Sequence, residues 1–319
     1  MIETPFPPSA AAAARLAELA ERVGPAVQAE VGEAVRRPTS DPLTGSTVPW
    51  ELVDRLVARH GLESPRELAL LALPVAGAMA RPPLSGYRVA AIGVEAASGD
   101  LVLGANLEFP GTDLGTTIHA EGFVALRARR RGRSLDALAV REAHPCAHCR
   151  QTLAESATAD RLTIVDLLGR ALTLEQLYPW PFRPAALGEL GDVAAAIAWP
   201  VLSLADNELP PEVASALLEA GSRAHAPYSR APSAVVLRLG DGRLVGAGCV
   251  ESVAFNPTIT AAQAALVEVA AARAEAGQVV EGWLARTEAG IVDSEPGFRA
   301  LLRAVAPAAR ATVVDWQVG

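Results

Sequence analysis

The sequence predicts an α/β protein in which a mixed-sheet layer structure occurs twice, behind an N-terminal helical region. Strand-like and helix-like patterns alternate along most of the chain, and a segment of the first half recurs in the second half. A Pro-rich stretch at 178–184 separates the halves, and 319 residues are enough for two domains. We expect an N-terminal helical region at 1–61, a first domain at 62–176, a linker at 177–203 and a second domain at 204–319.

The expected elements follow in order along the chain. Residues 9–35 read as one amphipathic helix. Residues 50–59 and 65–79 read as two more helices, the second of them apolar on nearly every side and therefore buried. The first domain then alternates strands with helices. Strands are expected at 87–94, 101–105, 135–140 and 161–168, and helices at 117–130 and from Pro145 onward, since Pro suits a first helical position.

The residues that carry chemistry gather between 117 and 151. Here His119-Ala120-Glu121 is followed by Pro145-Cys146-Ala147-His148-Cys149. One imidazole and two thiols supply three of the four ligands of a tetrahedral Zn²⁺ and leave the fourth place for a water. Glu121 would carry that water's proton. The order H-x-E, then P-C-x-x-C, is the signature of zinc deaminases, and it predicts one catalytic Zn²⁺ per chain.

Each half of this motif is ambiguous when taken alone. H-x-E is common on helix surfaces, and P-C-x-x-C is also found in redox pairs and in half-sites for structural zinc. His148 could complete a closed structural site, but it lies between the two cysteines, where its side chain has little room to turn inward. Cys146 and Cys149 are three residues apart and so share one helix face, where helix-start amides favour thiolates. The combined spacing favours catalytic zinc.

The second half repeats the first without the motif. Residues 226–239 resemble 82–94, and each stretch leads through a turn and a strand to a glutamate, Glu251 in the second copy. Aligned by position, Ala261 replaces the histidine ligand and Gln263 replaces Glu121. We therefore expect the second copy to keep the fold and to bind no metal. A domain of this kind would serve as a subunit interface or line the pocket of a partner subunit. Cys249 of the second copy reads as a small buried hydrophobic residue.

The segments PCAHCRQ, GANLEF, HAPYS and AFNPT carry a resemblance to the two-domain, homodimeric bacterial cytidine deaminases, a family of zinc-dependent nucleoside deaminases. The resemblance implies two cytidine-deaminase-like three-layer α/β/α domains with mixed sheets. It implies zinc ligation by His119, Cys146 and Cys149, and proton transfer by Glu121. The residues that it assigns to substrate binding are Asn106, Leu107 and Glu108, on a strip that contacts the ribose, and Tyr87, where the family has a Phe against the base.

The family likeness also implies a nucleoside substrate and a homodimer. The partner's second domain would complete each pocket with its 229–233 loop, which contains Ala231, and Phe182 of the linker is expected to reach the same pocket. His144 stands where a small hydroxyl residue is expected, so its carbonyl would accept a hydrogen bond from the C4 amine while its imidazole narrows the pocket. From the residues alone, Asn106 and Glu108 are two apart on an extended segment and suit a vicinal diol; otherwise they are strand-end polar groups.

Composition limits the other roles. A net charge of −8 and a pI near 5.3 argue against nucleic acid as a partner. The longest apolar run, 68–80, is too short to span a membrane, and the N-terminus lacks the basic start of a secretory signal. Three cysteines, two of them used on metal, fit a reducing compartment, so we expect a cytoplasmic protein. The basic run 127–133 reads as a solvated helix end, and His60 and His225 read as structural.

The predicted function is zinc-dependent hydrolytic deamination of cytidine and 2′-deoxycytidine to the uridine products and ammonia, in pyrimidine salvage. Zinc would lower the pKa of its water, and Glu121 would move protons to N3 and then to the leaving amine. Two alternatives stay open. One is a deaminase of the same fold acting on another amino-base, a deoxynucleotide or adenosine in RNA. The other is a non-catalytic scaffold stabilised by zinc.

Overall fold

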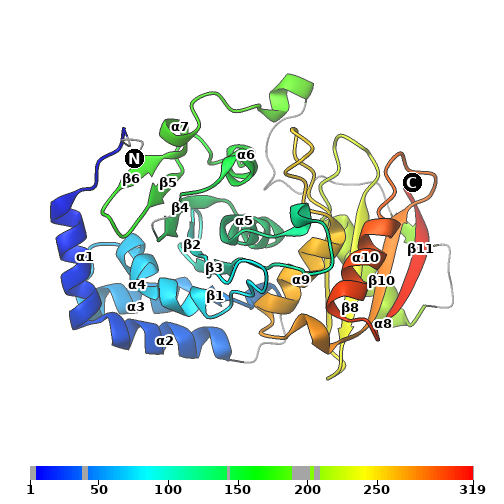
Figure 1. Cartoon of the computed structure of the whole chain (residues 1–319), viewed down its shortest axis with the longest axis horizontal. Helices are drawn as coiled ribbons and strands as arrows, with labels where there is room; N and C mark the ends of the chain where they lie inside the picture. The colour runs from blue at the N-terminus through cyan, green and yellow to red at the C-terminus, as the bar shows by residue number, and fades with distance from the viewer. Residues whose placement is uncertain (1–4, 38–41, 142–143, 189–201, 205–208, 319) are drawn as a thin grey trace. The chain divides into compact units, whose positions relative to one another are not determined.

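A computed structural model describes residues 5–37, 42–141, 144–188, 202–204 and 209–318 (Figure 1). The chain divides into two compact units. The first consists of Met1–Pro82, Tyr87–Asn106 and His119–Pro181, and the second of Pro83–Gly86, Leu107–Ile118 and Phe182–Gly319. Two short segments of the first half of the sequence, 83–86 and 107–118, therefore belong to the second unit. In the described residues, no helix is long and apolar enough to cross a membrane.

The first unit is built on a six-stranded mixed sheet with the strand order β1-β3-β2-β4-β5-β6. Only β4 and β5 run parallel; the other neighbouring pairs are antiparallel. The expected strands at 101–105 and 135–140 are confirmed with the same bounds, whereas the strand expected at 87–94 begins only at Ala90. The strands are β1 (Thr47–Val48), β2 (Ala90–Glu95), β3 (Leu101–Ala105), β4 (Leu135–Val140), β5 (Thr163–Val165) and β6 (Ala171–Thr173).

Helices cover both faces of this sheet. Helix α4 packs on one face, with α1, α2 and α3 behind it, and α5 packs on the other face, beside α6 and then α7. The apolar stretch expected to be a buried helix is α4, and its residues 68–73 are buried. The helices are α1 (Ala10–Arg22), α2 (Gly24–Arg36), α3 (Trp50–His60), α4 (Pro65–Gly77), α5 (Ala120–Arg130), α6 (Ala147–Ala154) and α7 (Leu174–Leu177).

The single helix expected at 9–35 is wrong, because α1 and α2 are separate. Val23 lies between them with φ −126° and ψ −10°, outside helical geometry, and α2 has Pro25 in its first turn. Pro lacks an N–H and clashes with the preceding turn, so it starts a new helix rather than continuing the old one. The apolar stripe crosses this break, which is why periodicity alone suggested one helix.

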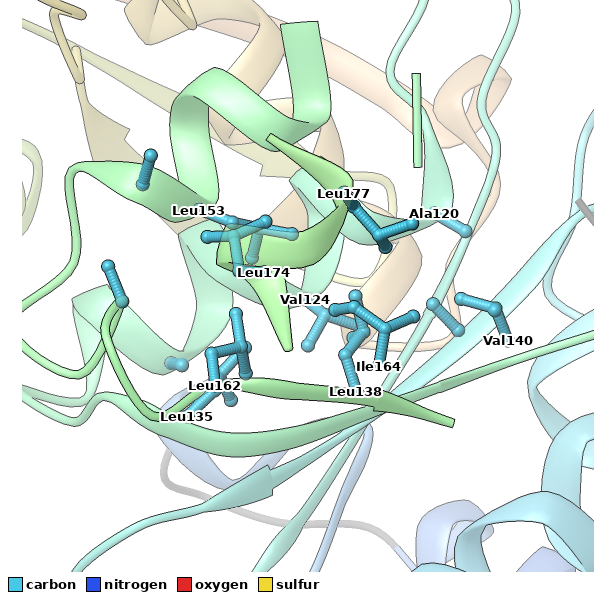
Figure 2. Packing of buried hydrophobic residues seen from close by; sticks show 14 of the residues in the cluster. Ala120, Val124, Leu135, Leu138, Val140, Leu153, Leu162, Ile164, Leu174 and Leu177 are labelled. Atoms are coloured by element: carbon cyan, nitrogen blue, oxygen red, sulfur yellow. The ribbon is translucent and has the colours of Figure 1, made fainter. Parts of the chain in front are cut away.

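Packing against the sheet and α6 positions the first turns of α5. Val124 of α5 packs with Leu138 of β4, Ile164 of β5 and Leu153 of α6 (Figure 2). Glycine lets α5 lie directly on the sheet: a Cβ atom at Gly104 would lie 2.7 Å from the carbonyl oxygen of Ala120, the first residue of α5. The small residue in β3 therefore sets the height of the start of α5 above the sheet.

The basic run 127–133 is not a solvated helix end, so that expectation is wrong. Arg127 is fully buried, and its guanidinium donates hydrogen bonds to the carbonyl oxygens of Leu43 at 2.9 Å and Gly45 at 2.7 Å. Arg131 forms an ion pair with Glu95, whose carboxylate is buried. Carbonyl and carboxylate oxygens thus replace water around these cations, and the run holds the loop before β1 against the domain.

The second unit repeats the architecture. Its five-stranded sheet has the order β7-β11-β10-β8-β9, with β10 and β11 parallel and the other pairs antiparallel. Val236 of β8 packs with α8, while its neighbours Val235 and Leu237 line the opposite side with α9 and α10, which makes three layers. The elements are α8 (Pro211–Ser222), α9 (Ala261–Ala271), α10 (Glu295–Val305), β7 (Leu202–Leu204), β8 (Ser233–Leu239), β9 (Leu244–Gly248), β10 (Val279–Thr287) and β11 (Arg310–Val318).

Candidate metal centre

Two helix starts in the first unit bring the motif together. His119 is the N-cap of α5, with extended backbone, and Glu121 lies in the first turn. Cys146 is the N-cap of α6, and Cys149 lies in the first turn of that helix. The expectation that Pro145 occupies the first helical position is wrong, because α6 begins at Ala147. The cap position leaves the Cys146 thiol beside the unpaired amides of the helix start, which favour negative charge.

The three ligand atoms have the spacing of a tetrahedral zinc site. The Sγ atom of Cys146 lies 3.4 Å from Nδ1 of His119, Sγ of Cys149 lies 3.6 Å from the same nitrogen, and the sulfurs are 3.7 Å apart. Zinc bonds of about 2.3 Å to sulfur and about 2.0 Å to nitrogen, at tetrahedral angles, require about 3.8 Å between sulfurs and about 3.5 Å from sulfur to nitrogen. The observed triangle fits zinc.

Among the described residues, these three form one compact group of possible metal ligands, with all ligand atoms within 4.8 Å of one another. His148 is not a member of the group, and its side chain is exposed. The closed structural site that His148 would have completed is therefore not formed. Three protein ligands leave the fourth tetrahedral position for water or substrate.

Glu121 lies at the buried side of the triad. The residue is 4% exposed, and its Oε2 atom is 3.8 Å from Sγ of Cys149. Burial raises the pKa of Glu121, because a charged carboxylate loses its hydration there. A carboxyl group whose protonated form is favoured in this way is suited both to accept and to donate a proton.

The two thiols ionise unequally before metal binds. Its hydrogen bonds with Cys149 and His119 lower the pKa of Cys146 to about 3. The hydrogen bond with Cys146 and burial raise the pKa of Cys149. One thiolate is thus already favoured in the triad, and a bound metal ion displaces the proton of the second thiol.

Asn106 and Tyr87 also lie in the first unit. The amide of Asn106 is 5% exposed, accepts from the N–H of Val89 at 2.9 Å and donates to the carbonyl oxygen of Tyr87 at 3.0 Å. It thereby ties the end of β3 to the segment before β2. Tyr87 itself is 59% exposed.

His144 precedes the metal-binding loop, and its imidazole is held by a buried carboxylate. Its Nε2 atom lies 2.9 Å from Oδ2 of Asp166. Arg150 supports the next residue, because its Nε atom donates to the Pro145 carbonyl oxygen at 2.7 Å. Sequence reasoning gave no role to Asp166 or Arg150. Asp166 lies far from the motif in the sequence, whereas the place of Arg150 next to Cys149 was a signal that could have found it.

Glu108 lies in the second unit, where it holds a loop. Its carboxylate accepts from the N–H groups of Leu84 and Ser85, at 2.8 and 2.9 Å, and from the Ser85 hydroxyl at 2.6 Å. The second copy has the same arrangement, in which Glu251 accepts from two N–H groups and the hydroxyl of Ser229. Both copies therefore use this glutamate to shape the equivalent loop.

Three further predicted site residues lie in the second unit. Leu107 is buried and pairs with Ile118 in an isolated bridge, Phe182 is 43% exposed, and Ala231 is buried. The metal triad and Glu121 are thus the predicted residues that the structure brings together in one group.

The structure of the repeat corrects the predicted alignment. Thr260 is the N-cap of α9, as His119 is of α5, and Ile259 pairs with Val250 as Ile118 pairs with Leu107. Thr260, not Ala261, is therefore equivalent to His119. By the same register Glu121 corresponds to Ala262, not to Gln263. The shared Thr-Ile pairs at 117–118 and 258–259 were the signal that could have given this register.

Gln263 has a structural role in the second unit. Its Oε1 atom accepts from the N–H of Thr260 at 2.9 Å, and its Nε2 atom donates to the carbonyl oxygen of Thr116 at 2.9 Å. The 107–118 segment, which leads directly to His119 in the sequence, is thereby attached to the start of α9.

Comparison with known proteins points to one family. Two family models, both described as the cytidine and deoxycytidylate deaminase zinc-binding region, match residues 63–165 and 174–296. The chain is 35% identical to a cytidine deaminase of Sodalis glossinidius over 79% of its length and 84% of the relative, and 35% identical to one of Serratia proteamaculans over 80% and 85%. A solved cytidine deaminase from Mycobacterium tuberculosis aligns with 34% of the chain and 90% of its own, at 30% identity and a TM-score of 0.31.

Proposed function

The chain belongs to the family of zinc-binding cytidine and deoxycytidylate deaminases, and from this premise we propose that it hydrolyses cytidine and 2′-deoxycytidine to the uridine products and ammonia, in pyrimidine salvage. The observation that carries the proposal is the triangle of His119, Cys146 and Cys149, which fits tetrahedral zinc, with buried Glu121 beside it. A non-catalytic scaffold needs neither an open fourth position nor an adjacent buried carboxyl group.

The chemistry divides between the metal and Glu121. When bound, zinc lowers the pKa of a water, so that hydroxide is present near neutral pH. Glu121 accepts the proton released from that water and donates it to N3 of the base as the oxygen adds to C4. Glu121 then passes the second proton of the added water to the exocyclic amine. The C4–N bond breaks, ammonia leaves, and one water has replaced one amino group.

Substrate contacts and assembly form the second part of this proposal. We assign ribose binding to the strip Asn106, Leu107 and Glu108, and contact with the base to Tyr87. Support comes from the GANLEF segment within the matched region 63–165. We assign the carbonyl of His144 to the C4 amine.

The proposed assembly is a homodimer. In it the partner's second domain, through the loop that contains Ala231, completes each pocket together with Phe182. The metal-free copy supports this, since a domain that has kept its fold without its ligands needs another use. Sedimentation tests it, and an active monomer would contradict it.

The remaining assignments follow from the same premise. We propose the division into an N-terminal helical region (1–61), a zinc domain (62–176), a linker (177–203) and a metal-free domain (204–319). Part of the linker lies outside the described residues. We also propose a cytoplasmic location, supported by three cysteines that are all free thiols.

The test of the activity is ultraviolet absorbance of zinc-loaded protein mixed with one substrate at a time. The panel is cytidine, 2′-deoxycytidine, free cytosine, deoxycytidylate and adenosine. We expect the cytidine band to decline with the first two and ammonia to appear in equal amount. If zinc is bound and only another amino-base reacts, the substrate assignment is wrong; if none reacts, the scaffold alternative holds.

A further inference from the structure

Asp166 directly follows β5, and its buried carboxylate holds two parts of the first unit together. Its Oδ1 atom accepts from the N–H groups of Leu168 at 2.9 Å and Arg170 at 3.0 Å, which forms the turn into β6. Its Oδ2 atom accepts from the Arg170 guanidinium at 3.1 Å and lies 2.9 Å from Nε2 of His144. The side chain of Asp166 is only 1% exposed. One carboxylate oxygen therefore builds the turn, and the other reaches a loop 22 residues earlier in the chain.

That loop carries a zinc ligand. His144 and Pro145 immediately precede Cys146, and each is held from a different side. Arg150 donates from Nε to the Pro145 carbonyl oxygen at 2.7 Å and from Nη1 to the Leu177 carbonyl oxygen at 2.9 Å. The main chain of Pro145 is therefore fixed by α6 itself, whereas the side chain of His144, within the part of the chain that the structure describes, is held by Asp166 at the β5–β6 turn.

We propose that Asp166 is a positioning residue of the metal centre, which acts by anchoring His144 and thereby the loop that ends in Cys146. The inference rests on the proposed zinc site. Zinc–ligand distances in well-formed sites lie within about 0.2 Å of their usual values, so a loop released at its His144 end holds the metal less firmly. Loss of an outer partner typically costs a metal site about 10- to 100-fold in affinity. Asp166 contacts His144, two residues before the ligand Cys146, and not the ligand itself. We therefore expect the lower end of this range, a loss of about tenfold in zinc affinity.

Two substitutions at position 144 separate the effect of the hydrogen bond to Asp166 from the effect of side-chain volume. In His144→Gln the amide nitrogen extends about as far as the imidazole Nε2 and can donate to Asp166. In His144→Asn the same amide is one methylene shorter and cannot reach. Asp136→Asn is the matched control, because it removes an exposed ion pair with Arg66 elsewhere in the same unit. Asp166→Asn keeps an acceptor oxygen for the turn and removes the carboxylate.

The experiment measures zinc release from the full-length, substrate-free protein into a chromogenic chelator, with the visible spectrum of the Co²⁺ form as a second readout. We expect His144→Asn and Asp166→Asn to release zinc about tenfold faster, the double variant to add little to either, and His144→Gln and Asp136→Asn to stay within about twofold of the parent. Parent-like release from His144→Asn, or equal release from the Asn and Gln variants, would overturn the proposal. If the zinc result holds while no substrate is deaminated, only the proposed activity fails.

Discussion

Substitution of Glu121 by Gln removes the proton carrier and leaves the metal ligands in place. The change replaces a carboxyl group by an amide of the same size, and the residue is 4% exposed, so bulk water cannot take over its role. One general acid–base group typically contributes about 10²- to 10⁴-fold to a rate. Glu121 serves two successive proton transfers in the proposed reaction, so we expect a loss near the upper limit. A 10⁴-fold loss of kcat corresponds to about 5.4 kcal/mol in the activation free energy.

The assay pairs kcat for cytidine with zinc content per chain. Glu155→Gln is the control, because it makes the same chemical change at another buried carboxylate, which accepts a hydrogen bond from Gln151 at 2.8 Å. We expect Glu121→Gln to bind as much zinc as the parent with kcat reduced about 10⁴-fold, and Glu155→Gln to stay within about twofold. A Glu121→Gln protein with kcat within tenfold of the parent would refute the proton-transfer role.

Three further substitutions test the metal site and its supports. Cys149→Ala removes one of three protein ligands, and zinc measured per chain should fall to near zero together with activity. Gly104→Ala should lower the free energy of unfolding by about 1–3 kcal/mol in denaturant titration, because its Cβ atom would lie 2.7 Å from the Ala120 carbonyl oxygen. Gln263→Glu places an oxygen against the Thr116 carbonyl oxygen and should cost about 1–3 kcal/mol by the same titration, with zinc content unchanged. Parent-like stability in either of the last two would show that the contact contributes little.

The metal triad could be predicted because its information is local. Two cysteines one helical turn apart and a histidine two residues from a glutamate define the ligand types and the proton carrier. The fold then needs only to bring two helix starts together, as it does at His119 and Cys146. Strands β3 and β4 were likewise predictable, because each is a short, mostly apolar segment that follows turn residues.

Several features that sequence reasoning missed depend on contacts between residues that are separated in the sequence. Arg127 looked solvated because its neighbours in the sequence are basic, and its acceptors are carbonyl groups 82 and 84 residues away. The register of the repeat is set by the bridge between Val250 and Ile259, and counting positions in the sequence missed it by one residue. The contact of His144 with Asp166 spans 22 residues and follows no periodic pattern. Sequence periodicity reports which side of an element is buried, but not which distant polar group will satisfy a buried cation or imidazole.

The central claim is that His119, Cys146 and Cys149 hold a zinc ion that takes part in the reaction. The most direct test strips the metal with a chelator, restores it in steps, and measures zinc per chain and cytidine turnover on the same samples. We predict turnover that rises in proportion to zinc and levels off at about one ion per chain. Full turnover by the stripped protein, or full zinc occupancy without any turnover, would contradict the account.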